Sequence, residues 1–396
     1  MKRTIKLAVA AAVALTSTAA FATNGDHLIG TGAKARGMGG VGIGMSHGAE
    51  SALTNPALIT SVEGTEISFG GTVFMPKVKT DTGAGLTDSA ADLSVIPEVS
   101  IAQKASDNFY WGIGMFGTAG MGVDYRAHTG TLGTTTGNYS MVTNLQLMQF
   151  AVPLAYKTGG FSFGIAPVLQ YGSLDINYRT DYMGGTGGNT RGVAQDFGFG
   201  YNLGAAYTEQ GLTVGASYKS AIDMKYDGQI SKAATDFGLS GFTDNLEQPA
   251  EIGIGTSYKL SGNTFAVDFK QIKWGSAKGY KDFNWEDQNV IILGYQYAQD
   301  SWALRAGYNH AKSPIKESTT PQINLFNLLG FPAIVENHYT VGGTYAFNKT
   351  TSADLAYVYS PEASQTFGAA GGLSTSGTIT TKHSQQAATA QLNFKF

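Results

Sequence analysis

"AATAQLNFKF", at positions 387–396, ends the sequence and has the pattern from which the fold follows. Leu392 and Phe394 alternate with the polar residues Gln391 and Asn393, so an extended chain here has one apolar face and one polar face. A period of two residues is typical of a β-strand whose two faces lie in different environments. Because a water-soluble β-sandwich alternates in the same way, the connections between strands must separate the two architectures.

Similar segments recur along the chain from position 64 onward. We predict strands over 64–75, 92–104, 108–118, 142–157, 160–177, 193–208, 211–226, 247–259, 262–274, 288–298, 301–312, 335–347, 351–360 and 383–396. Tight turns, such as "KTGG" and "LSGN", alternate strictly with much longer connections. An up-and-down barrel in a bacterial outer membrane has this alternation, with short periplasmic turns and long extracellular loops.

The sequence therefore predicts an all-β protein, a 14-stranded antiparallel transmembrane β-barrel over residues 64–396. The strand number is even, as in single-chain bacterial barrels, and only a closed barrel satisfies every backbone group of a sheet in lipid. Aromatic residues such as Trp111 and Trp302 fall near strand ends, where their rings suit the membrane interface. The terminal Phe396 resembles the assembly signal of outer-membrane barrels, so we expect the barrel-assembly machinery to be a partner.

The first 22 residues, "MKRTIKLAVAAAVALTSTAAFA", predict a secretory signal peptide. A basic start is followed by a short apolar core, and Ala20-Phe21-Ala22 has the small-x-small pattern of a cleavage site. The alternative, a first transmembrane helix, is disfavoured because the apolar run is shorter than the ~20 residues that span a bilayer. The mature chain would begin at Thr23 and reach the outer membrane of a Gram-negative bacterium.

Composition excludes several classes of function. Lys and Arg number 26 against 29 Asp and Glu, so the chain lacks the basic surface that nucleic acid requires. Cysteine is absent, which rules out disulfides and thiolate chemistry. The six histidines are scattered, with neither an H-E-x-x-H nor a G-x-S-x-G motif, and the acidic loops lack EF-hand spacing. We expect no catalytic residue, no cofactor and no metal.

A glycine-rich stretch, "ARGMGGVGIG" at 35–44, has the G-x-G-x-x-G spacing of a dinucleotide-binding loop. That loop needs a preceding strand in a βαβ unit, and only about a dozen residues lie between the predicted signal peptide and the glycines. We instead predict that residues 23–63 form a hatch inside the barrel, because a barrel of this size is too wide for its own side chains to fill. The alternative is a flexible periplasmic tail.

Several of these features together resemble the FadL/TodX outer-membrane transport family. They are Asn55-Pro56-Ala57 within "ALTNPALI", the glycine-rich "ARGMGGVG", the predicted strand number, and "INLFNLLGFPAIVENHYTVGGTYAF" at 323–347. The resemblance spans essentially the whole mature chain. It implies a barrel with an N-terminal hatch that carries hydrophobic molecules, such as long-chain fatty acids or aromatic hydrocarbons. Extracellular loops would capture the molecule, which would leave by passive lateral diffusion through the barrel wall.

Two sets of residues are candidates for the first and last steps of that path. For capture, the loop at 321–335 contributes the apolar residues Leu325, Phe326, Leu328, Leu329 and Phe331. Their spacing also fits a short loop helix packed on its neighbours. For a kink that opens the wall, the third strand contributes Gly114, Gly117 and Gly120. Glycine inside a strand marks bends and bulges, although the same glycines could only provide space for the hatch.

Two further sets concern the hatch and a charged headgroup. Asn55, Pro56 and Ala57 would fix a turn in the hatch, because proline restricts itself and the residue before it. A carboxylate headgroup could bind Arg305, Lys270 or Lys273, although polar lumens contain such residues routinely. An uncharged hydrocarbon would need none of them.

The leading hypothesis is an outer-membrane transporter for hydrophobic small molecules. The alternatives are a diffusion porin for polar solutes, which predicts an open lumen, and a barrel whose loops bind a host surface. The expected partners are the hydrophobic ligand and the lipid and lipopolysaccharide of the outer membrane, with no nucleic acid. We expect a monomer.

Overall fold

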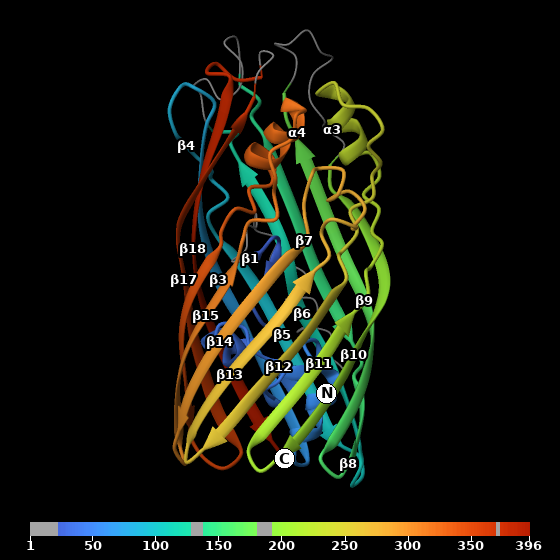
Figure 1. Cartoon of the computed structure of the whole chain (residues 1–396), viewed down its shortest axis with the longest axis vertical. Coiled ribbons are helices and arrows are strands. Elements are labelled where there is room, and N and C mark those ends of the chain that lie inside the picture. Colours follow the sequence, from blue (N-terminus) through green and yellow to red (C-terminus); the bar gives the residue numbers. More distant parts are fainter. Residues whose placement is uncertain (1–22, 128–137, 180–191, 370–372) are drawn as a thin grey trace, which may run out of the picture.

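A computed structural model describes residues 23–127, 138–179, 192–369 and 373–396. The predicted signal peptide, residues 1–22, lies outside the described residues. The chain forms a closed antiparallel barrel (Figure 1), and the predicted 14-stranded architecture is confirmed within the described residues. Its strands are β3 (Thr65–Asp81), β5 (Ser94–Lys104), β6 (Phe109–Asp124), β7 (Val142–Ala151) continued by β8 (Leu154–Thr158), β9 (Phe161–Asn177), β10 (Ala194–Glu209), β11 (Leu212–Lys219), β12 (Glu251–Leu260), β13 (Asn263–Ile272), β14 (Gln288–Ala298), β15 (Trp302–Ala311), β16 (Asn337–Ala346), β17 (Thr351–Gly368) and β18 (Thr378–Lys395).

The last strand closes the barrel against the first. β18 pairs with β3 from Lys395 opposite Glu66 to Thr380 opposite Asp81. Leu392 points outward, whereas Gln391 and Asn393 are buried in the interior. A slip of one residue would turn every apolar side chain of this strand into the lumen, so the alternation in sequence fixes the register.

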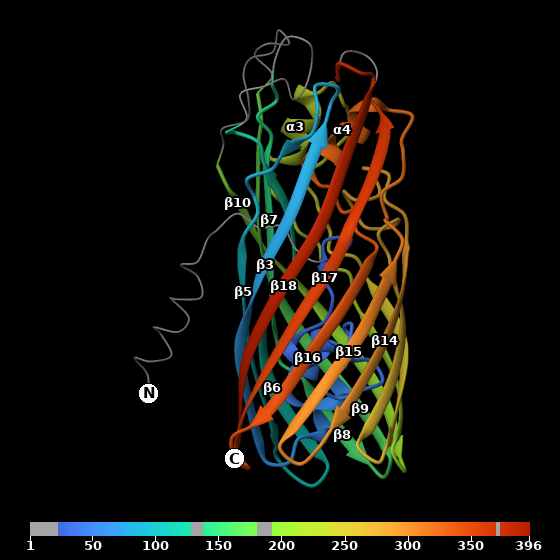
Figure 2. The ribbon, with the colours of Figure 1, turned by 90° about the vertical axis from the view of Figure 1, so that its left-hand side faces the viewer.

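The wall is higher on one side than on the other. β17 and β18 have 18 residues each, whereas β11 has 8, and Figure 2 shows β3, β17 and β18 rising far toward the loop end. A short strand β4 (Thr87–Asp88) pairs with the upper part of β3. Within the described part of the chain, no helix is both long and apolar enough to cross a membrane.

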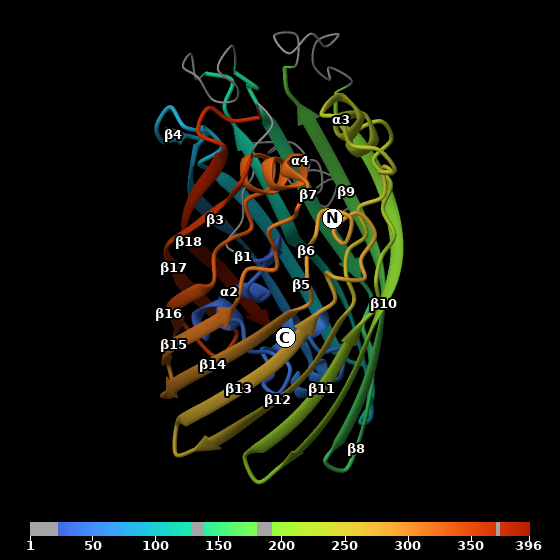
Figure 3. The ribbon, with the colours of Figure 1, turned by 45° about the horizontal axis from the view of Figure 1, so that its top comes forward.

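The N-terminal residues lie inside the barrel, where Figure 3 shows them enclosed by the wall. They form β1 (Thr23–Asn24), β2 (His27–Leu28), the helix α2 (Gly32–Gly37) and two 3-10 helices, η1 (Gly48–Ala52) and η2 (Pro56–Ser61). Nearly all of these residues are buried. We use the name hatch for residues 23–63.

Glycine allows the hatch to lie directly on the wall. A Cβ at Gly44 would lie 2.3 Å from the carbonyl carbon of Gly255 on β12. Gly39 has a φ of +74°, and a Cβ there would lie 2.9 Å from the backbone nitrogen of Tyr308 on β15. At both positions backbone meets backbone, which a larger residue would prevent.

Three short helices fold over the opposite end of the barrel (Figure 1). They are α3 (Ile230–Asp236), α4 (Pro321–Leu325) and the π-helical turn η4 (Phe326–Gly330). Their apolar side chains join the largest buried cluster, which also contains upper residues of β6 and β7 and aromatic residues of the loop between β13 and β14. The lumen is thus closed by loops above and by the hatch below.

Candidate functional site

A small apolar cavity lies beneath the loops. We call it the upper cavity, and it is lined by Met121, Ile230, Leu246, Tyr280, Phe283, Trp285, Asn327 and Phe331. The amide of Asn327 accepts from Trp285 Nε1 at 3.0 Å and donates to the carbonyl of Phe283 at 2.7 Å. Because these bonds occupy the amide, the cavity offers a ligand mainly aromatic and aliphatic surface.

Leu325 ends α4, three of the other predicted capture residues lie in η4, and Phe331 directly follows η4. Phe331 reaches the cavity lining. Leu325, Leu328 and Leu329 are fully buried in the core cluster. Phe326 is one layer behind the cavity, with its ring 5.9 Å from that of Phe283. The five residues therefore come from one continuous segment, and of these five only Phe331 lines the cavity.

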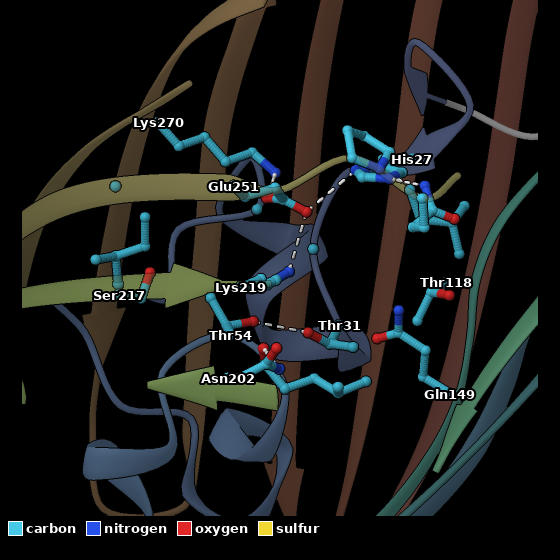
Figure 4. A pocket seen from close by; sticks show the side chains of 18 of the residues that line it. His27, Thr31, Thr54, Thr118, Gln149, Asn202, Ser217, Lys219, Glu251 and Lys270 are labelled. Atoms are coloured by element: carbon cyan, nitrogen blue, oxygen red, sulfur yellow. Dashed lines mark hydrogen bonds and ion pairs between the residues drawn. The ribbon is translucent and has the colours of Figure 1, made fainter. Parts of the chain in front are cut away.

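A larger, more polar chamber lies between the hatch and the wall (Figure 4). We call it the lower chamber, and its polar lining includes His27, Thr31, Thr54, Thr118, Gln149, Asn202, Ser217, Lys219, Gln248, Glu251, Asp268 and Lys270. These residues come from the hatch, from β6 and β7, and from β10 to β13. The chamber therefore lies between the hatch and two groups of strands, β6 with β7 and β10 to β13.

A layer of aromatic side chains separates the two spaces. Trp274 lies with its ring 4.6 Å from that of Tyr280 and 4.9 Å from that of His27. The Tyr280 hydroxyl donates to the carboxylate of Asp26. Gly25 has a φ of +68°, and a Cβ there would lie 2.5 Å from Trp274. We call Asp26, His27, Trp274 and Tyr280 the partition, since one layer of side chains closes the passage between the cavities.

Asp26 is a charged residue type in a fully buried position. Burial raises the pKa of its carboxyl group, while His27 and the Tyr280 hydroxyl act in the opposite direction. Its backbone carbonyl accepts from Gly120 of β6 at 3.1 Å. The hatch is thus attached to the wall at the level of the partition.

The lower chamber contains a compact ionic cluster. Glu251 lies 2.9 Å from Lys270 Nζ, 3.3 Å from Lys219 Nζ and 3.1 Å from His27 Nδ1. Lys219 and Glu251 are register partners on β11 and β12, so the sheet itself brings them together. Figure 4 shows both lysines directed at the same carboxylate.

The three predicted headgroup residues do not converge. Lys270 lines the lower chamber, as described above. Arg305 is buried in another part of the lumen, where it lies 3.4 Å from Asp354. Lys273 follows the end of β13 and pairs with Asp287 at 2.9 Å in a more exposed position.

The wall is interrupted beside the lower chamber. In the described residues, β5 and β6 pair from Lys104 opposite Tyr110 only as far as Glu98 opposite Phe116. The pairing of β6 with β7 shifts register between Gly117 and Ala119. A β-bulge of this kind bends a strand and weakens local pairing.

The hatch lies against this interruption. Ala119 forms a bridge with His27 on β2, which lies inside the barrel beside β6. Gly117 lines the lower chamber, and a Cβ there would lie 2.4 Å from the Ile96 side chain of β5. Gly114 lies below the break and Gly120 above it.

Asn55, Pro56 and Ala57 attach the hatch to the opposite wall. Asn55 begins η2, and its side chain accepts from Ala57 N at 3.2 Å. Its amide donates to Ile43 O at 2.8 Å and to Ala205 O of β10 at 3.3 Å. A Cβ at Gly164 of β9 would lie 2.4 Å from Ala57 N. The motif caps a helix and contacts backbone, and it lines neither cavity.

The glycine-rich stretch does bind an anion through its backbone, but the anion belongs to the wall. Gly42 N and Ile43 N donate to Asp268 Oδ2 at 2.7 and 2.8 Å, and Gly44 N donates to Asp268 Oδ1 at 3.2 Å. Successive backbone N–H groups form such a concave donor site wherever glycine permits the turn. Here the site fastens the hatch to β13.

Sequence reasoning missed Lys219, Glu251 and the partition. The polar face of 211–219 could have indicated Lys219, because Lys219 has the same parity as the other inward positions Ser217 and Gly215. Its partner Glu251 follows only from the register between β11 and β12, which no local pattern gives. Trp274 and Tyr280 lie in a loop, where periodicity carries no information.

The family model described as "Outer membrane protein transport protein (OMPP1/FadL/TodX)" matches residues 8–396. The "Long-chain fatty acid transport protein" of Escherichia coli K12 is 24% identical over 428 residues, covering 89% of this chain and 91% of the relative. The "47 kDa outer membrane protein" of Pasteurella multocida is 22% identical over 386 residues, covering 82% and 86%.

Solved structures share the fold. The Pseudomonas putida toluene transporter TodX has a TM-score of 0.70 at 20% identity, covering 93% of this chain and 99% of that structure. A Pseudomonas aeruginosa FadL homologue has a TM-score of 0.70 at 14% identity, covering 94% and 100%. At these identities the likeness concerns the fold.

Proposed function

Since this chain belongs to the OMPP1/FadL/TodX family of outer membrane transport proteins, we propose that it takes up hydrophobic small molecules, long-chain fatty acids or related hydrocarbons. The names of two similar proteins, a long-chain fatty acid transport protein and a toluene transporter, both describe hydrophobic cargo. The observation that supports the proposal most strongly is the upper cavity, which is almost wholly apolar. A diffusion porin would instead need a continuous aqueous lumen.

We propose that the ligand enters beneath the loops and binds first in the upper cavity. Phe331 and Phe283 line this cavity, and η4 covers it. Transfer of an apolar molecule from water into such a site is favourable by roughly 25 cal/mol per Å² of apolar surface buried. The binding step thus concentrates ligand at the outer face without any covalent chemistry.

The ligand then passes the partition and leaves sideways. Movement of Trp274 or of the hatch residues beneath it would join the upper cavity to the lower chamber. We propose release through the wall break at Gly117, because this residue lines the chamber at the point where β5 and β6 cease to pair. Lateral release delivers an apolar molecule into lipid, so it never has to cross the hatch.

A substitution at the break tests this proposal. Gly117→Val places a branched side chain against Ile96, which should obstruct the break and lower uptake of a labelled hydrophobic probe several-fold. Gly343→Val is the matched control, since Gly343 lies on the outward face of β16, where the nearest atom to a Cβ is 3.3 Å away. Uptake would be measured in cells whose outer membrane limits entry. Equal uptake by both variants and the wild type would exclude release at Gly117.

A further inference from the structure

The charges that line the lower chamber are balanced. Lys219 and Lys270 both contact Glu251, at 3.3 and 2.9 Å. Asp268, the neighbouring inward residue on β13, also lines the chamber and is fully buried. Two lysines and two acidic side chains therefore line the chamber. A site for an anionic ligand would instead present cations in excess.

Other buried cations that the structure describes inside the barrel are paired as well. Lys34 lies 2.9 Å from Glu50. Arg36 donates to Glu98 at 2.8 Å, and Arg305 lies 3.4 Å from Asp354. Each of these positive charges has a carboxylate of the same chain as its partner. An entering anion would have to compete with that carboxylate.

The upper cavity adds a second obstacle to an anion. Its lining, as far as the chain is described, contains no charged side chain. Asp26 lies beneath it, bonded to Tyr280, and Asp26 Oδ1 has no hydrogen-bond partner. A carboxylate bound here would lose its hydration without gaining a cation, and transfer of an unpaired charge out of water is strongly unfavourable.

We propose that Glu251 determines the substrate class: by pairing with both Lys219 and Lys270 it makes the path selective for uncharged hydrophobic molecules over fatty-acid anions. The inference rests on the proposed function and names the cargo of the same path. Glu251 is thus a specificity-determining residue that acts through the two lysines. Removing its charge should turn the lower chamber into a carboxylate site.

The test compares two probes with the same alkyl chain, dodecan-1-ol and dodecanoate. Binding to the purified full chain is followed by tryptophan fluorescence at mildly alkaline pH, where dodecanoate is charged. The wild type should bind the alcohol more tightly than the anion. Glu251→Gln keeps the size of the side chain but removes its charge and one of its two acceptor oxygens, and it should raise dodecanoate affinity at least about tenfold, which corresponds to about 1.4 kcal/mol. Its affinity for the alcohol should stay the same.

Two further variants separate the charge effect from a change in folding. The triple variant Glu251→Gln, Lys219→Gln, Lys270→Gln removes both lysine charges together with the carboxylate, and it should lose the gain in dodecanoate affinity. Glu251→Gln combined with Lys273→Gln should keep the gain, because Lys273 pairs with Asp287 and does not line the chamber. Heat-modifiable migration on gels would show that each barrel is folded.

The outcomes distinguish the inference from the proposed function. Tighter binding of dodecanoate than of dodecanol by the wild type, or an unchanged dodecanoate affinity in Glu251→Gln, would overturn the role of Glu251 while leaving hydrophobic transport intact. Failure of the wild type to bind either probe would overturn the proposed function and this inference with it.

Discussion

Glu50 lies in the hatch where several carboxylates share one lysine. Lys34 Nζ is 2.9 Å from Glu50, 3.8 Å from Glu66 and 3.9 Å from Asp354. Burial, with the negative charge of Asp354, raises the pKa of Glu50 from 4.5 to about 7, although Lys34 opposes the shift. The three acids raise the pKa of Lys34, which stays protonated. One of the acids is therefore easily protonated near neutral pH.

The shift predicts a pH dependence of stability. The folded state binds the Glu50 proton more tightly than the unfolded chain does, so this contribution is complete below pH 4.5 and is lost as pH rises to about 7. It amounts to about 3 kcal/mol as an upper estimate, at 1.36 kcal/mol per pKa unit. The apparent thermal midpoint of the purified barrel should therefore decrease as the pH is raised from 4.5 to about 7. Glu50→Gln should make this decrease smaller. An equally steep fall in the variant would assign the effect to another group.

At the residue scale, sequence patterns located charged side chains that face the lumen but not the carboxylates that pair with them. Parity along the strand placed Lys270 and Arg305 toward the lumen, because alternation is a local property. It could not show that Glu251 and Asp354 pair with them, since those contacts depend on register between strands. Lys273 has the parity of the outward residues of β13 and lies past the strand end. The roles of these residues in ligand binding stay predictions.

At the scale of elements, the loop between β13 and β14 and the hairpin formed by β1 and β2 together make the partition. Trp274 of the loop is fully buried against Gly25 and His27 of the hairpin. It also packs on Trp285, with 5.1 Å between the ring centroids. Sequence reasoning placed the hatch residues inside the barrel and the loop above it, but a contact between two irregular segments has no periodic signature.

Removal of the Trp274 ring should open the passage between the two cavities. Trp274→Ala should therefore speed uptake of an uncharged hydrophobic probe, at a cost in stability of about 3–5 kcal/mol for loss of a buried aromatic ring. Trp302→Ala is the control, because Trp302 is exposed on the outer face of β15 and contacts neither cavity. Initial uptake rates in cells with matched amounts of folded barrel give the comparison. An uptake rate for Trp274→Ala at or below that of Trp302→Ala would show that the partition supports the structure without limiting transport.

At the scale of the whole molecule, much of the fold follows from local patterns. Period-two alternation and turn residues gave the strand number and the closure of the barrel, both confirmed here. The strand ends were less predictable: β3 extends to Asp81, β6 to Asp124 and β17 to Gly368, and β18 begins at Thr378. Segments such as "PEASQTFG" have polar residues on both faces above the membrane, so alternation gives no signal there.

We propose that the hatch keeps a wide barrel from leaking. Three backbone N–H groups of the hatch donate to Asp268 on β13, and Arg36 of the hatch pairs with Glu98 on β5. The two attachments therefore lie on different strands. The proposed path for apolar molecules passes between the hatch and the wall and leaves through the wall. A barrel without the hatch should conduct ions, whereas the intact barrel should not.

The most direct test compares the intact chain with a version lacking residues 24–60, by planar-bilayer conductance and by uptake of a labelled hydrophobic probe in cells with limited outer-membrane permeability. We predict uptake with little conductance for the intact chain, and large steady conductance once the segment is removed. Large conductance from the intact chain without uptake of the hydrophobic probe would contradict this account and identify a porin.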